Sequence, residues 1–383
     1  MLEVQSFKDL PLSAQVQRTI KELGFETLFP IQAQAIMPLL DGKDVIGQAQ
    51  TGTGKTAAFG VPMVERLDPQ VRKVQGLILV PTRELAMQVT QNMIQFSKYA
   101  KLRVTAVYGG ASMERQMREL QNGAQIVVGT PGRIIDLIER RMLNLSFVKI
   151  VVLDEADRML DMGFIEDITY ILSKAPASRQ TSLFSATIDR TVMNVCNRYM
   201  KNPVKVFVSK DEIGVTQMKQ YYIVVNPHAK FDTLCNILRE DNIERAIVFC
   251  RTRRETSKRA EKLAQKGYRT QALHAGFTQP QRERAINAFR AAKLNLLIAT
   301  DVAARGLDIE GVTHIINYDV PMDPPVYFHR VGRTARKGSD GTAITIVSYG
   351  EMSDFNNIKA ITKTTIEEIK TNTKSDSPVV SFY

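Results

Sequence analysis

A glycine-rich segment that ends in a lysine and a threonine lies near the start of the chain. Residues 49–56 read AQTGTGKT, after an expected strand at 44–47 and at the start of an expected helix. Strand, loop and helix in this order are the context that a phosphate-binding loop requires. Glycine lets the backbone turn so that its N–H groups face phosphate oxygens, and a helix N-terminus adds free donors and a favourable dipole. We therefore expect nucleotide contacts from Ala49, Gln50, Thr51, Gly52, Thr53, Gly54, Lys55 and Thr56.

Two side chains of this loop and two carboxylates further along carry the expected chemistry. Lys55 would contact the β- and γ-phosphates, and the Thr56 hydroxyl would bind Mg²⁺. Asp154 and Glu155 follow the apolar run IVVL at 150–153, and ligands bind beyond the carboxyl ends of parallel strands. Asp154 would orient Mg²⁺, and Glu155 would take a proton from the water that attacks the γ-phosphate. A solvated acidic turn is the alternative interpretation of the two carboxylates, and a phosphate loop on a neighbouring strand argues against it.

The elements that must position these residues are short apolar strands alternating with amphipathic helices. Such continuous apolar strands indicate parallel sheets covered by helices on both faces, which is an α/β fold. The chain has 383 residues, more than the roughly 250–300 that one hydrophobic core supports, so two domains are expected. The clearest helices are expected at 84–100 and 254–266. The expected strands are 44–47, 76–80, 125–129, 149–153 and 181–184, then 221–225, 246–250, 295–299, 313–317 and 342–347.

These strands fall into two sets, which gives the expected organisation of the chain. The first domain would span 1–208, and a polar, charged linker would span 209–219. The second domain would span 220–370. The last stretch, 371–383, is rich in Thr, Ser, Lys and Pro and is expected to be a frayed tail.

Composition narrows the possible partners and the compartment. The 51 Lys and Arg exceed the 40 Asp and Glu, a net charge of +11, which points to a polyanion, nucleic acid first, although many basic proteins share this bias. Cys196, Cys235 and Cys250 form neither a disulfide framework nor a zinc pattern, as in reduced cytosolic proteins. The chain shows no targeting peptide and no apolar run near the ~20 residues of a membrane helix. We expect a cytoplasmic protein with no membrane partner.

Further motifs run in order from about residue 6 to about residue 350. They include Phe7, Gly24-Phe25 and Pro30-Ile31-Gln32 ahead of the phosphate loop, and Asp-Glu-Ala-Asp at 154–157. The series resembles the DEAD-box family of ATP-dependent RNA helicases, in overall wording most like its bacterial cold-shock and RNA-turnover members. The resemblance implies two tandem RecA-like domains, each a parallel sheet flanked by helices. It also implies that Phe25 stacks on adenine and that Gln32 bonds its edge, so that ATP is preferred to GTP. Leu28 stands where the family usually has proline.

Other segments resemble the RNA-contacting loops of this family. In the first half they are PTREL at 81–85, Gly109-Gly110 and TPGR at 130–133; in the second half they include FCRT at 249–252 and ATD at 299–301. Backbone N–H groups, hydroxyls and arginines suit phosphate oxygens and carry no sequence information, so RNA binding should be sequence-tolerant. The resemblance implies RNA contacts at Pro81, Thr82, Arg83, Gly110, Thr130, Arg133, Thr252, Arg282 and Thr300.

The remaining motifs resemble segments that connect the two activities. Residues 329–336 read HRVGRTAR, and Arg333 and Arg336 are three apart, on one side of a helix. The resemblance implies that both reach the γ-phosphate as arginine fingers, which contribute a factor of ~10³–10⁵ in related nucleotidases. It implies that Asp308 contacts the ribose. The family commonly has His-Gly at His274-Ala275-Gly276 and glycine at Ala335. The residues implied in coupling ATP state to strand separation are Asp157, Ser185, Thr187 and His329.

The expected function is therefore an ATP-dependent RNA helicase. The first domain would hold ATP and Mg²⁺ and the second would supply the arginines, so that ATP and RNA each favour closure and tighten the other's binding. RNA-stimulated ATP hydrolysis would drive local duplex unwinding and RNP remodelling, with the helix that starts near Arg133 as a wedge. Two alternatives are a DNA helicase or translocase, and a non-enzymatic RNA clamp. The sequence does not identify the RNA target: ribosomal assembly, RNA decay and cold adaptation are all compatible.

Overall fold

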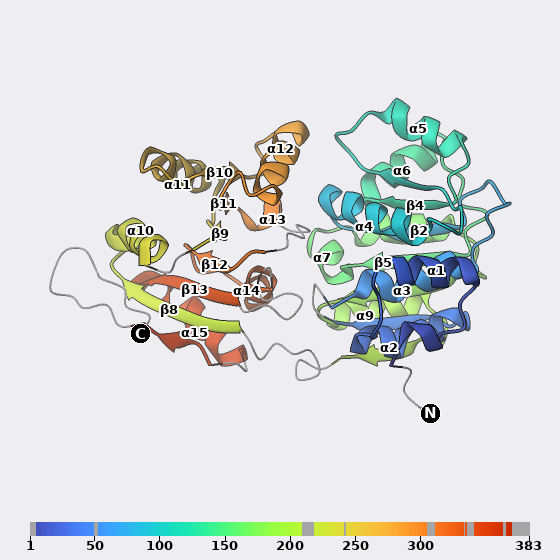
Figure 1. Ribbon diagram of the computed structural model, residues 1–383, viewed down its shortest axis with the longest axis horizontal. Coiled ribbons are helices and arrows are strands. Elements are labelled where there is room, and N and C mark those ends of the chain that lie inside the picture. The colour runs from blue at the N-terminus through green and yellow to red at the C-terminus, as the bar shows by residue number, and fades with distance from the viewer. Residues whose placement is uncertain are drawn as a thin grey trace. The chain divides into compact units, whose positions relative to one another are not determined.

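The computed structural model describes residues 5–49, 53–208, 218–240, 243–304, 311–332, 334, 341–362 and 365–369. The chain divides into two compact units, Met1–Ile213 and Gly214–Tyr383, each built on its own sheet (Figure 1). The predicted tail and most of the predicted linker lie outside the described residues.

The first unit is built on a parallel sheet of seven strands in the order β3-β4-β2-β5-β6-β1-β7. Every residue of β2, β4, β5 and β6 is buried, because helices cover both faces. The strands are β1 (Val45–Gln48), β2 (Gly76–Leu79), β3 (Val104–Val107), β4 (Ile126–Gly129), β5 (Ile150–Asp154), β6 (Gln180–Ser185) and β7 (Val204–Phe207). The helices are η1 (Phe7–Asp9), α1 (Ala14–Glu22), α2 (Pro30–Leu40), α3 (Lys55–Arg66), α4 (Arg83–Phe96), α5 (Met113–Gln121), α6 (Pro131–Glu139), α7 (Ala156–Asp161), α8 (Ile165–Ser173) and α9 (Arg190–Tyr199).

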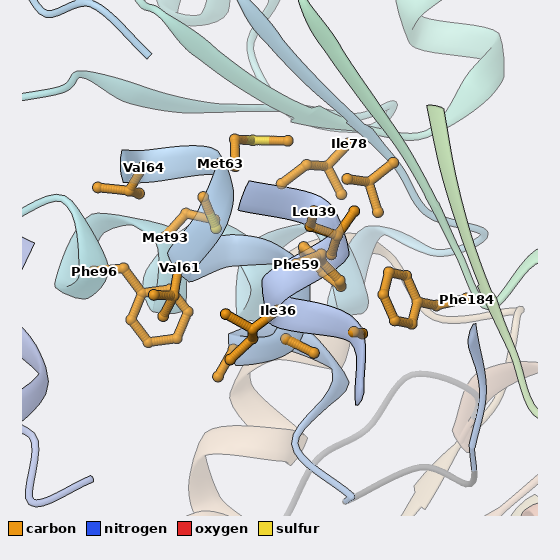
Figure 2. Close-up of a cluster of buried hydrophobic side chains, with 14 of the residues drawn as sticks. Ile36, Leu39, Phe59, Val61, Met63, Val64, Ile78, Met93, Phe96 and Phe184 are labelled. Atoms are coloured by element: carbon orange, nitrogen blue, oxygen red, sulfur yellow. The ribbon is translucent and has the colours of Figure 1, made fainter. Parts of the chain in front are cut away.

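Two hydrophobic cores lie on the two faces of this sheet. Successive strand residues point to opposite faces, so Ile78 joins the core beneath α2, α3 and α4 while its neighbours Leu77 and Leu79 join the core beneath α6 to α9. Figure 2 shows part of the first core, where Phe59 of α3 lies near Phe184 of β6, with ring centroids 5.4 Å apart. Burial on both faces fixes β1, β5 and β6 in place, and these strands lead into the phosphate loop and the acidic motif.

The second unit has a parallel sheet in the order β10-β11-β9-β12-β13-β8-β14. Its strands are β8 (Met218–Val225), β9 (Ala246–Phe249), β10 (Thr270–Leu273), β11 (Leu296–Ala299), β12 (His314–Asn317), β13 (Gly341–Ser348) and β14 (Glu367–Glu368). Its helices are η2 (Pro227–Ala229), α10 (Lys230–Glu240), α11 (Arg253–Gln265), α12 (Gln279–Arg290), α13 (Asp301–Ala304), α14 (Pro324–Val331), η3 (Tyr349–Glu351) and α15 (Met352–Ile361).

Two parallel sheets flanked by helices confirm the predicted fold class. The helix predicted at 84–100 ends earlier, at Phe96, where Ser97 forms the C-cap and Lys101 takes a positive φ of 59°. The four strands β3, β7, β10 and β14 are absent from the prediction. Within the described residues, no helix combines the length and the apolar character that crossing a membrane requires.

Candidate nucleotide and RNA site

The phosphate loop joins β1 to α3 in the first unit. Ala49 N donates to Ser185 O at 3.0 Å, which ties the end of the β1 strand to β6. Gly54 is the N-cap of α3 with a φ of +84°, and a Cβ at this position would collide with the Gln32 amide. Only glycine meets both conditions without strain. Gln50, Thr51 and Gly52 lie outside the described residues.

Lys55 is the first residue of α3 and is only 7% exposed. Its Nζ donates to the backbone carbonyl of Ala49 at 2.8 Å, across the base of the loop. Thr53 is buried and Thr56 is partly buried in the same turn. The ammonium therefore lies at a helix N-terminus, where the backbone dipole already favours an anion.

The carboxylates Asp154 and Glu155 lie at the carboxyl end of β5. Asp154 is 3% exposed, and this burial raises its pKa to about 6, against the opposing effect of the Lys55 charge. Glu155 N donates to Asp154 Oδ1 at 3.0 Å. Glu155 itself has a left-handed backbone with a φ of 52°, a conformation that non-glycine residues rarely adopt and that occurs at functional sites.

Burial makes the Asp154 carboxyl hard to ionise in the absence of a bound cation. A divalent cation would stabilise its carboxylate form. Within the described part of the chain, no three His, Cys, Asp or Glu side chains come together as a dedicated metal site. Mg²⁺ does not need such a cage, because it takes one or two protein ligands and completes its shell with water and phosphate oxygens. Asp154 and the Thr56 hydroxyl fit that limited donor set.

A buried arginine that the sequence analysis did not identify pairs with Glu155. Arg158 Nη1 lies 2.7 Å from Glu155 Oε2, and the two side chains are 2% and 6% exposed. Glu155 is the N-cap of α7 and Arg158 lies in its first turn, at the i,i+3 spacing that brings side chains together. That spacing is the signal in the sequence that could have revealed the pair.

Asp157 joins the acidic motif to the Ser-Ala-Thr segment that follows β6. Its Oδ2 accepts from both Thr187 N and Thr187 Oγ1 at 3.0 Å. Its backbone N–H donates to Ser185 Oγ at 3.2 Å, and that hydroxyl donates to Thr187 O at 2.7 Å. The structure thus brings Asp157, Ser185 and Thr187 into one hydrogen-bonded cluster.

The predicted adenine motif lies against the phosphate loop. Gln32 Nε2 donates to Gly54 O at 3.1 Å, while its Oε1 accepts from Phe29 N at 2.9 Å. Phe25 is half-buried, with ring centroids 5.5 Å from Phe7 and 6.2 Å from Phe96. Phe25 therefore packs on the core of the first unit, and Gln32 is fixed by the loop beside which a nucleotide would lie.

The RNA candidates of the first unit lie at the carboxyl ends of β2, β3 and β4. Buried Pro81 precedes Thr82, which caps α4 by accepting from Leu85 N at 3.3 Å. Arg83 covers Gly110, which has a φ of +82°, and its guanidinium occupies the place that a Cβ would take. Thr130 is the N-cap of α6. Arg133 Nη1 donates to Gln116 Oε1 at 3.3 Å, and its Nε lies 3.6 Å from Asp136 Oδ2.

The RNA candidates of the second unit differ in exposure. Thr252 is exposed and caps α11, accepting from Glu255 N at 3.2 Å. Arg282 is partly exposed on α12, and Thr300 is buried where β11 leads into α13. Asp308, Arg333 and Arg336 lie outside the described residues, as does the side chain of His329.

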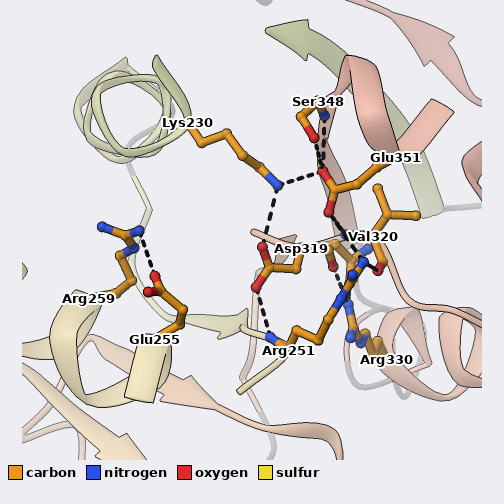
Figure 3. Close-up of polar contacts among 10 residues, drawn as sticks. Lys230, Arg251, Glu255, Arg259, Asp319, Val320, Arg330, Ser348 and Glu351 are labelled. Atoms are coloured by element: carbon orange, nitrogen blue, oxygen red, sulfur yellow. Dashed lines mark hydrogen bonds and ion pairs between the residues drawn. The ribbon is translucent and has the colours of Figure 1, made fainter. Parts of the chain in front are cut away.

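A network of charged side chains links the carboxyl ends of the central strands in the second unit (Figure 3). Lys230 Nζ lies 2.8 Å from Glu351 Oε2 and 3.4 Å from Asp319 Oδ1. Arg251 N donates to Asp319 Oδ2 at 2.8 Å. Arg330, 2% exposed, donates from Nε and Nη2 to the two carboxylate oxygens of Asp301 at 2.6 and 2.8 Å. The sequence analysis identified none of these pairs.

Comparison with known proteins places the chain in a family. Residues 29–195 match the family described as DEAD/DEAH box helicase, and residues 229–338 match the helicase conserved C-terminal domain. The chain is 46% identical over 372 residues to the DEAD-box ATP-dependent RNA helicase CshA of Bacillus licheniformis, covering 97% of this chain and 76% of the relative. It is 45% identical to CshA of Bacillus subtilis, covering 97% and 75%.

A solved structure agrees with these sequences. Dbp5 of S. cerevisiae bound to RNA and ADP BeF3 is similar with a TM-score of 0.87 and 33% identity, over 96% of each chain. The chain belongs to the DEAD-box family of ATP-dependent RNA helicases, enzymes that hydrolyse ATP. The predicted family, fold and enzyme class are confirmed.

Proposed function

We propose that this chain binds ATP with Mg²⁺ in the first unit and couples its hydrolysis to local, sequence-tolerant remodelling of RNA. The observation that carries the proposal is the cluster at the carboxyl edge of the first sheet. There Lys55 follows β1, while Asp154 ends β5 and Glu155 comes next, two strands away in the sheet order. A cation at a helix N-terminus opposite buried carboxylates suits a nucleotide triphosphate and its metal.

The residues of this cluster divide the work of phosphoryl transfer. Lys55 would neutralise charge on the β- and γ-phosphates, and Thr56 and Asp154 would hold Mg²⁺. Mg²⁺, when bound, would supply positive charge at the phosphate oxygens. Glu155 Oε2 is held by Arg158 at 2.7 Å, which orients the carboxylate that would accept a proton from the attacking water. Arg333, Arg336 and Asp308 of the second unit would complete the site.

The Asp157 cluster supports a connection between nucleotide state and RNA. Asp157 is two residues from Glu155, and its carboxylate holds Thr187 through two hydrogen bonds. A displacement of the acidic motif when ATP is hydrolysed would therefore move the Ser185–Thr187 segment directly. His329 would extend this connection into the second unit. RNA phosphates would bind the loops at Thr82, Gly110, Thr130 and Arg133 in the first unit, and at Thr252, Arg282 and Thr300 in the second.

Two wider statements belong to the same proposal. The net charge of +11 and the backbone-directed RNA loops suit structured RNA in ribosomal or RNA-decay assemblies. With such partners the protein would act in the cytoplasm.

The test is RNA-stimulated ATP hydrolysis by Glu155→Gln and Arg333→Ala beside the wild type. Both variants should lose a factor of about 10² or more in kcat, since each removes a group that acts on the transition state. Wild-type turnover in either variant would remove that residue's role. Hydrolysis that is indifferent to RNA would refute the coupling, and equal competition by DNA of the same sequence would favour a DNA translocase.

A further inference from the structure

A hollow lined by positive charges lies at the amino edge of the first sheet, opposite the nucleotide site. It has a volume of about 790 Å³. Asp44 comes just before β1, Lys149 comes just before β5, and Gln180 opens β6, so the starts of three strands meet there. All strands of the sheet are parallel, so Lys55 and Asp154 lie at its other edge. A five-residue strand such as β5 separates the two edges by roughly 17 Å.

The lining of this hollow holds five cations and one acid. The cations are Lys43, Arg66, Lys149, Arg179 and Lys201. Both oxygens of the acid, Asp44, already accept backbone N–H groups, from Thr181 at 2.8 Å and from Lys201 at 2.6 Å. The charge of the lining is therefore positive by four, because its single carboxylate accepts two backbone N–H groups and also acts on Arg179.

The hydrogen-bond partners of these cations are mostly neutral. Arg179 Nη1 donates to three backbone carbonyls at the end of α8, at 3.1 to 3.3 Å. Arg66 Nη1 donates to Leu39 O at 3.2 Å and to the Gln180 side chain. Lys201 Nζ donates to Ala177 O at 2.7 Å. Lys43 has a long, exposed pair with Asp41 at 3.7 Å. Carbonyls hold Arg66, Arg179 and Lys201 in place without cancelling their charge. An anion in the hollow would therefore meet a preformed positive field.

An exposed aromatic ring completes the surface. Phe147 lines the same hollow and is 48% exposed. Cations beside an exposed ring suit a single-stranded nucleic acid, whose phosphates bind the charges while a base stacks on the ring. An acidic polypeptide would use the charges and leave the ring without a role.

We propose that this hollow is a second RNA site, which binds the backbone of a single strand that extends beyond the helicase site and stacks one base on Phe147. The proposal rests on the proposed function, because a strand already held at the carboxyl edge reaches the hollow as an intramolecular event. A second contact of this kind raises the affinity for long RNA without changing that for short RNA. The site would anchor substrate while the two units work on another part of the same strand.

The test compares a short and a several-fold longer oligouridylate, with Lys149→Glu/Lys201→Glu as the variant. Both lysines are exposed, so the fold should persist, and a thermal melt checks it. The affinity of the variant for the long strand should fall about tenfold at low salt. The slope of log K against log salt should fall by about 1.4, at roughly 0.7 for each lost phosphate contact on a single strand. ATP hydrolysis saturated with the short strand should not change.

Matched controls separate charge from stacking. Lys21→Glu/Lys293→Glu makes the same change of charge at two exposed lysines elsewhere and should leave the advantage of long RNA intact. Phe147→Ala should weaken long RNA by about tenfold with no change in salt slope, because stacking on one base is not ionic. Phe207→Ala removes a ring of similar exposure, 47%, and should have no effect.

Several outcomes would overturn the second site. One is wild-type affinity and salt slope for the long strand in Lys149→Glu/Lys201→Glu. Another is an equal loss for the short strand, which would assign the lysines to the helicase site. Polyglutamate or inorganic tripolyphosphate binding at the hollow, with no effect of RNA length, would reassign it to an acidic protein or a free phosphate compound. Loss of RNA-stimulated hydrolysis in the wild type would refute the proposed function instead, since the length effect is measured by binding alone.

Discussion

The two units share one topology, but they use the lysine at the start of the first α-helix after the first strand differently. Strand for strand, the order β3-β4-β2-β5-β6-β1-β7 corresponds to β10-β11-β9-β12-β13-β8-β14. In both units the first α-helix after the first strand begins with a lysine, Lys55 on α3 and Lys230 on α10. Both lysines are nearly buried, at 7% and 6% exposure. Fold and burial alone therefore do not distinguish a nucleotide site from its counterpart.

The partners of the two lysines do distinguish them. Lys230 has ion pairs with Glu351 and Asp319 at 2.8 and 3.4 Å, so its charge is satisfied within the unit. Lys55 instead donates to a backbone carbonyl, and the nearby Glu155 has its own cation, Arg158. A lysine that stabilises two carboxylates is structural. The charge of Lys55 lowers the pKa that burial raises at Asp154, but its hydrogen bond goes to a neutral carbonyl, so its charge remains available to a phosphate.

The largest effects should come from removing each lysine in turn. Lys55→Met should lower RNA-stimulated kcat by about 10²–10³ while leaving the first unit folded, because the lost charge acts on the transition state. Lys230→Met should destabilise the second unit by about 3 kcal/mol, because it removes the cation of Asp319 and leaves Glu351 with only Arg251, at 3.5 Å. Steady-state kinetics measure the first effect. Hydrogen exchange in peptides from β12 and β13, in the intact protein, measures the second.

A matched double variant sharpens this comparison. Lys230→Met/Glu351→Gln removes one of the two carboxylates that lose Lys230, so it should recover part of the lost protection. If Lys230→Met abolished hydrolysis without loosening β12 and β13, Lys230 would have a role in catalysis. The proposed difference between a structural Lys230 and a phosphate-binding Lys55 would then be wrong.

The strands that the sequence predicted and those that it missed differ in their place in the sheets. The predicted strands include the central ones, β2, β5, β9 and β12, which are buried along their whole length and read as continuous apolar runs. The missed ones, β3, β7, β10 and β14, are the four edges. An edge strand borders solvent, so β7 and β14 are largely exposed and carry no such run.

The site shows a similar limit. Motif spacing identified Lys55, Asp154 and Glu155, because strand, loop and helix fix their positions from nearby residues. It did not identify Arg158 as a partner of Glu155, since the same i,i+3 spacing occurs on many solvated helices. It also missed Lys230 with Glu351, which are 121 residues apart. Only the folded sheet brings such residues together.

A moderate effect should come from Arg158, which we expect to be a positioning residue for Glu155. Arg158→Met should lower kcat by about 10–100-fold, the range for losing a residue that orients a group in direct contact with the reaction. The KM for ATP should stay near the wild-type value, because Arg158 would act on the reaction only through its ion pair with Glu155. Arg158→Lys keeps a cation on the same turn and should recover part of the rate. A loss of nucleotide binding equal to the loss of rate would show that Arg158 is needed for the fold of the loop.

The smallest effect should be a dependence on pH that the first unit shows and the second does not, measured without nucleotide or Mg²⁺. Burial raises the pKa of Asp154 from 3.8 to about 6, so its carboxylate destabilises the first unit at neutral pH. Protonation between pH 7 and pH 5 should restore about 1 kcal/mol. For Glu351, burial alone would raise the pKa, but hydrogen bonds from Lys230 and Ser348 outweigh burial and lower it below 4.5.

The contribution of Glu351 is thus complete above its ordinary pKa and is lost only as the pH falls through the lower pKa of the folded state. Hydrogen exchange at pH 7 and pH 5, corrected for the intrinsic exchange rate, should show β5 better protected at pH 5 and β13 unchanged. Asp154→Asn should abolish the change in β5, and Glu351→Gln should leave it intact. Equal gains in protection in both sheets would contradict this comparison. They would mean that Lys230 and Ser348 stabilise the Glu351 carboxylate no better than the first unit stabilises that of Asp154.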